Sequence, residues 1–267
     1  MHSRRASPAF WVVVMLTLAL FGFVGVVLLR PNVIAGLLGH DMAGHITQHF
    51  RLPIHRVHDL TFSFLIGTAA VGMLAQLRTP SQNVAGQLMA LVPWGALGLA
   101  FALARTWLRF APAPLFGALT LFATILHPTA RSFFRSFRFA RVSRVVLALV
   151  IIAAVPLLGF AFPNIGLQRT VTNEHAMLGH YGFMAAFAFT VIGVGLVASL
   201  RPAGWKLTAW VAGFLPILLG ATSLVFSDND SSLGVVWSLV AIGWGVVFIA
   251  AATLTKDEAS QTVRAII

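Results

Sequence analysis

Residues 180–200 read HYGFMAAFAFTVIGVGLVASL, an apolar run without Asp, Glu, Lys or Arg. A helix that spans a lipid bilayer needs about 20 mostly apolar residues, so this run is long enough for one crossing. Other stretches of similar length and polarity are residues 8–29, 58–77, 87–104, 110–127, 143–162, 207–226 and 234–254. The sequence therefore predicts eight transmembrane helices.

The composition agrees with an integral membrane protein. Of the 267 residues, 58% are hydrophobic and only 9% are charged. A soluble domain carries roughly 25% charged residues, which excludes an ordinary globular protein. Such high hydrophobicity also excludes a disordered chain. We expect an all-α integral membrane protein.

The net charge of +11 reflects membrane orientation and not nucleic-acid binding, because the basic residues lie between the apolar spans. The Lys and Arg residues are more numerous in the segments on the side of the membrane that is expected to hold both termini. We therefore expect an integral plasma (inner) membrane protein with cytoplasmic termini and an extracytoplasmic outer loop over residues 31–57. The segment from Arg131 to Arg144 alternates Arg and Phe, a pattern typical of an interfacial helix on anionic lipids.

The chain also shows signs of an internal duplication. Matching residues recur in order at a nearly constant spacing: His58 with His180, Arg78 with Arg201, Pro80 with Pro202, and Pro93 with Pro216. The dipeptides Pro31-Asn32 and Pro163-Asn164 are expected to close the first and fifth spans. These matches predict two tandem four-helix bundles related by a pseudo-two-fold axis along the membrane normal. The expected units are residues 1–130, a basic linker over 131–141, and residues 142–267.

Histidines and carboxylates gather on the expected outer side. Neutral imidazole binds zinc, copper and haem iron, and the chain has no cysteine to offer thiolate ligands. His58 and His180 fall at the outer ends of equivalent helices, where they are candidate ligands of haem b or of one metal ion. The further candidate metal ligands are His40, His45, His49, His55, His175, Asp41, Asp59 and Glu174.

Three functions remain open at this stage. The first is a redox or metal-handling protein that binds haem b, copper or zinc through the outer histidines. The second is a non-catalytic membrane subunit that packs against partner proteins or lipids. The third is a small-molecule transporter, suggested by the duplication and by Pro93 and Pro216 within two spans. The sequence leaves open whether any reaction is catalysed.

Overall fold

The computed structural model describes residues 6–29, 55–106, 112–131, 133, 142–229 and 231–255. Their regular structure is helical. The helices are α1 (Pro8–Leu29), α4 (Arg56–Leu74), α5 (Val84–Ala104), α6 (Pro112–Leu126), α7 (Arg144–Thr170), α8 (Glu174–Leu178), α9 (His180–Ser199), α10 (Trp205–Val225) and α11 (Gly234–Leu254), with 3₁₀ turns at Ala75–Leu77 and Pro80–Gln82.

Seven of these helices are long and apolar enough to cross a membrane. This agrees with the all-α membrane class predicted from the sequence. The expected span over residues 110–127 corresponds to α6, which has 15 helical residues. A helix of that length measures about 22 Å, whereas the hydrocarbon core of a bilayer is about 30 Å thick. The eighth span, like the tandem duplication, stays a prediction.

The end of the fifth span was predicted wrongly. Pro163 and Asn164 were expected to close it, but α7 continues through both to Thr170. Proline removes only one N–H, the one that would bond the carbonyl oxygen of Gly159, and membrane helices tolerate this loss. The Asn164 side chain adds a hydrogen bond to the carbonyl oxygen of Phe160 at 2.9 Å within the same turn. The helix passes the dipeptide and reaches the loop before α8.

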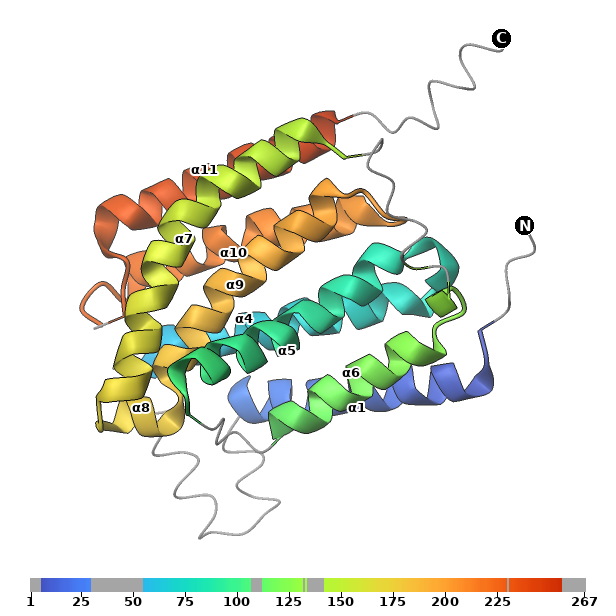
Figure 1. Ribbon diagram of the computed structural model, residues 1–267, viewed down its shortest axis with the longest axis horizontal. Helices are drawn as coiled ribbons and strands as arrows, with labels where there is room; N and C mark the ends of the chain where they lie inside the picture. Colours follow the sequence, from blue (N-terminus) through green and yellow to red (C-terminus); the bar gives the residue numbers. More distant parts are fainter. Residues whose placement is uncertain are drawn as a thin grey trace, which may run out of the picture.

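The long helices lie side by side in one bundle (Figure 1). Helices α4, α5, α9 and α10 occupy the middle, where α5 packs on α9 and α4 on both α5 and α9. Helices α1 and α6 pack together at one edge, and α7 and α11 lie at the other (Figure 1). The first turns of α4 and α9 meet at the same end of the bundle, which we call the histidine end.

A buried, hydrogen-bonded histidine lies at the opposite end of the bundle. His127 follows α6, is buried, and places Nε2 3.1 Å from the carbonyl oxygen of Pro80 and 3.2 Å from Oε1 of Gln76. The backbone N–H of Thr129 donates to Nδ1 at 3.2 Å. Because Nδ1 accepts, Nε2 carries the proton and donates. Protein groups thus satisfy both ring nitrogens, and His127 ties α6 to the turn between α4 and α5.

Glycine allows α4 and α5 to approach closely. A Cβ atom at Gly72 would lie 2.4 Å from the carbonyl oxygen of Gly86. Small residues at such crossings are typical of packed membrane helices. Gly67, in the same helix, faces open space instead, since an added Cβ atom would meet nothing within 4 Å.

We expect Gly72→Ala to lower the stability of the bundle by about 1–3 kcal/mol, because the added methyl group forces the two backbones apart. Gly67→Ala is the matched control and should leave stability unchanged or raise it by up to about 1 kcal/mol. Thermal unfolding of the detergent-solubilised variants measures both effects. Equal midpoints for the two variants would contradict the close crossing.

Candidate metal centre

The turn from α8 into α9 positions the histidines of these two helices at the histidine end. Gly179 adopts a φ of 84°, a left-handed conformation that favours glycine. A Cβ atom on Gly179 would lie 3.0 Å from Cζ of Phe101, and one on Gly182 would lie 2.5 Å from the same atom. The absence of side chains at both positions lets the first turn of α9 lie directly against the end of α5.

Four imidazoles meet where α4 and α9 begin. They belong to His55, His58, His175 and His180, and their side chains are all buried. Ring centroids of neighbouring pairs are 4.7 to 5.3 Å apart. Neutral imidazole is a common metal ligand, so four candidate ligand rings lie together at this end of the bundle.

Three of the rings direct nitrogen atoms at one another. Nδ1 of His180 lies 3.1 Å from Nδ1 of His175 and 3.3 Å from Nδ1 of His55. One candidate ligand atom from each of these three residues lies within 4.8 Å of the other two. A neutral imidazole carries one ring nitrogen with a lone pair, which is the atom that a metal ion binds.

A metal ion would satisfy all three nitrogens together. In a tetrahedral site with zinc–nitrogen bonds of about 2.0–2.1 Å, neighbouring ligand atoms lie about 3.3 to 3.4 Å apart. The two Nδ1 separations of 3.1 and 3.3 Å are close to this value. The cluster can therefore hold an ion with three nitrogen ligands and one remaining coordination position.

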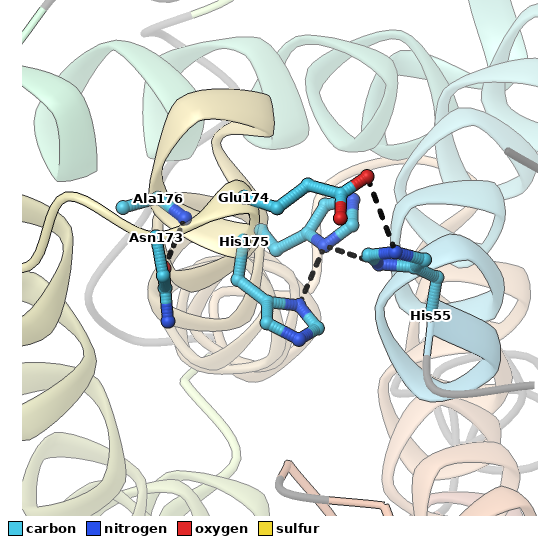
Figure 2. Close-up of polar contacts among 6 residues, drawn as sticks. His55, Asn173, Glu174, His175 and Ala176 are labelled. Carbon is cyan, nitrogen blue, oxygen red and sulfur yellow. Dashed lines mark hydrogen bonds and ion pairs between the residues drawn. The ribbon is translucent and has the colours of Figure 1, made fainter. Parts of the chain in front are cut away.

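A carboxylate lies behind one of the three rings. Figure 2 shows His55 reaching in from α4, while Glu174 and His175 come from α8. Oε1 of Glu174 is 3.7 Å from Nε2 of His55, an ion-pair contact longer than a hydrogen bond. A carboxylate next to the second ring nitrogen of a ligating histidine raises the basicity of that ligand. The Glu174 side chain is 56% exposed, so the rim of the cluster meets solvent.

His58 is the fourth imidazole and differs from the others. Its ring stacks on that of His180 with centroids 4.7 Å apart and planes 17° apart. Its Nε2 is hydrogen bonded to Oγ of Ser231, in the loop before α11. Its buried Nδ1 has no hydrogen-bond partner among the described residues. His58 thus packs beside the three converging rings and links them to the α10–α11 loop.

Side chains from the neighbouring turns fix the position of α8. Asn173 caps this helix by accepting from the backbone N–H of Ala176 at 3.0 Å, and it donates to the hydroxyl of Tyr181 at 3.1 Å (Figure 2 shows the cap). Gln168 of α7 donates to the carbonyl oxygen of Ala176 at 2.8 Å and accepts from the N–H of Gly182 at 3.0 Å. One buried amide therefore joins α7, α8 and α9 around the cluster.

The structure brings together five of the candidate residues that the sequence suggested: His55, His58, His175, His180 and Glu174. Asp59 lies in the first turn of α4, and its carboxylate is outside the group of three converging ligands. His40, Asp41, His45 and His49 lie outside the described residues.

Sequence reasoning missed the supporting residues. Asn173 precedes a short helix as capping residues do, so its role was open to prediction from local pattern. Gln168 and Ser231 carried no such signal: Gln168 bonds across the turn from α7 to α8 and α9, and Ser231 bonds His58, 173 residues away.

Comparisons with known protein families, with curated proteins and with solved structures found no match for this chain. The fold and the cluster still define a class: a polytopic helical membrane protein with a buried histidine cluster that could hold a metal ion.

We expect Gln168→Leu to destabilise the protein by about 2–4 kcal/mol, because it leaves the Ala176 carbonyl and the Gly182 N–H buried without partners. Asn164→Leu is the matched control on the same helix, since Asn164 bonds only to its own preceding turn. Chemical denaturation in detergent compares the two. A loss no greater than that of the control would show that Gln168 does not hold α8 and α9 together.

Proposed function

We propose that this protein binds a zinc or copper ion through His55, His175 and His180, in a metal-handling or redox role. The observation that supports the proposal is the convergence of three Nδ1 atoms at 3.1 and 3.3 Å. Imidazole nitrogen suits both metals. Glu174 lies 3.7 Å from Nε2 of His55, and His58 packs against His180.

The ring contacts favour an ion over haem b. A haem with two axial histidines has its porphyrin between the two imidazoles. The rings of His58 and His180 instead stack on each other at a centroid distance of 4.7 Å, which leaves no room for a porphyrin between them. Binding haem through this pair would require the starts of α4 and α9 to separate.

Three protein ligands with one open position are typical of sites that exchange ligands or activate water. When bound, the ion would supply Lewis acidity, or, for copper, electron transfer. The chain's own residues hold the nitrogens in place, exclude bulk water through burial, and leave an approach from the rim. Glu174 and Met177 line this rim, with a carboxylate and a thioether open to solvent.

The membrane placement belongs to the same proposal. The distribution of Lys and Arg supports cytoplasmic termini in the plasma (inner) membrane and an extracytoplasmic histidine end. Arg131–Arg144, most of which lies outside the described residues, would then face anionic cytoplasmic lipids. The non-catalytic subunit and the small-molecule transporter stay alternative predictions, and neither has a feature as specific as the converging nitrogens.

We expect the purified wild-type protein to retain one zinc or copper ion after dialysis, and His180→Ala to bind it at least about 100-fold more weakly, because two of the closest nitrogen contacts involve His180. Equilibrium dialysis with elemental analysis measures the affinity. His127→Ala is the control, since His127 is a buried histidine at the other end of the bundle.

A second variant separates this cluster from the histidines outside the described residues. Replacing His40, His45 and His49 together by Ala should leave binding intact if His55, His175 and His180 suffice. A wild-type protein that binds neither Zn²⁺ nor Cu²⁺, or a His180→Ala variant that binds as well as His127→Ala, would overturn the proposal.

We expect Glu174→Gln to weaken metal binding by about 10- to 100-fold, because the amide cannot support the basicity of His55 as a carboxylate does. Asp228→Asn removes another carboxylate of the described chain and should not change the affinity. The same dialysis measurement gives the metal affinity of both variants. Equal affinities would show that Glu174 does not strengthen metal binding.

A further inference from the structure

A cavity of about 620 Å³ lies between the second half of α5 and the first half of α6. Its volume falls within the range of roughly 300–1,000 Å³ that is typical of small-molecule sites. Most of the residues that line it are apolar or small, and they include Leu97, Phe101, Ala113 and Ala118. One lining residue, Arg105, carries a charge. The cavity therefore combines an apolar wall with a single cation.

The cavity narrows in the middle of the bundle and widens toward the histidine end. At the narrow end α5 and α6 touch, since a Cβ atom on Gly117 would lie 3.4 Å from Cβ of Trp94. One turn further along α5, Gly98 also lines the cavity, but a Cβ atom there would meet nothing within 4 Å. Arg105, directly after the last residue of α5, lines the wide end.

The length of the cavity matches one leaflet of a bilayer. The rise along α5 from Trp94 to Arg105 is about 16 Å at 1.5 Å per residue. Half of the hydrocarbon core of a bilayer is about 15 Å thick. Helix α5 is long and apolar enough to span the membrane, and Gly98 and Ala102 at the edge of the cavity are exposed on it. A lipid acyl chain beside α5 therefore reaches from the bilayer centre to the level of Arg105.

The charge of Arg105 lies where a lipid head group would be. Arg105 is exposed and comes directly after a membrane-spanning helix, which is the level of the interface. Among the residues that the structure describes, it forms no ion pair with a carboxylate. A guanidinium group offers paired N–H donors that suit the oxygens of a phosphate.

We propose that this cavity binds one anionic phospholipid, with an acyl chain between α5 and α6 and the phosphate on Arg105. The chain contacts the apolar wall, and the head group meets the one positive charge of the lining. A zwitterionic lipid brings its own ammonium group to the same end, so it binds more weakly. The proposal does not depend on a metal in the histidine cluster, because it stands on the cavity and on Arg105 alone.

Native mass spectrometry of the detergent-solubilised full chain measures which lipid stays bound. The probes are phosphatidylglycerol, which is anionic, and phosphatidylcholine with the same acyl chains, offered in equal amounts. We expect the wild type to retain one phosphatidylglycerol molecule with a preference of about five- to tenfold, the effect of one basic residue at the membrane surface. Arg105→Gln should remove this preference and still retain lipid through the apolar wall.

Arg169→Gln is the matched control for the charge. Arg169 is also exposed at the histidine end, in the last turn of α7, but it does not line the cavity. This variant should keep the preference of the wild type.

A second pair of variants tests the cavity itself. Gly98→Leu fills it and should abolish the retention of both lipids. Gly95→Leu is its control, because a Cβ atom on Gly95 likewise meets nothing within 4 Å, and Gly95 does not line the cavity. Thermal unfolding of the two variants shows whether both are folded.

Four results would each overturn the proposal. A wild type that retains no lipid would show that the cavity takes up none. Equal retention of the two lipids by the wild type would identify the occupant as hydrocarbon without a preferred head group. An equal loss of preference in Arg169→Gln would attribute it to general surface charge. Undiminished retention of phosphatidylglycerol by Gly98→Leu would place the lipid elsewhere on the bundle.

Discussion

The packing of the first turn of α9 against the first turn of α4 holds the candidate site together. It stacks His180 on His58 and brings Nδ1 of His180 to 3.3 Å from that of His55. Gly179 and Gly182 let the same turn of α9 also lie against α5, because a Cβ atom at either position would crowd Phe101. A small shift of α9 would thus separate the nitrogens on which metal binding depends.

Buried histidines at the two ends of the bundle have different kinds of neighbours. At the end opposite the cluster, His127 has partners on both ring nitrogens, supplied by Pro80, Gln76 and Thr129. At the histidine end, ring nitrogens face mainly one another. The contrast separates a histidine with a structural role from rings whose nitrogens converge as those of metal ligands do.

Local pattern predicted most of the helices but not all of their ends. The spans expected at residues 8–29 and 234–254 coincide with α1 and α11, because charged or turn-forming residues flank each apolar run. Pro163 was a misleading signal, since a proline removes only one helical hydrogen bond and α7 continues past it to Thr170. The start of the span expected at residues 110–127 falls on residues outside the described chain, so only its part in α6, Pro112–Leu126, is seen.

By itself the sequence determined the class of protein and the residue types available for a site. Long apolar runs require helices in a membrane, and a chain with imidazoles but no thiols restricts the ligands. Only the tertiary structure decided that His55, His175 and His180 meet, while Asp59 lies outside their group. Their convergence depends on Gln168 of α7, which bonds across the turn to α8 and α9, and on glycines packed against Phe101 of α5, a contact between distant parts of the chain that no local pattern encodes.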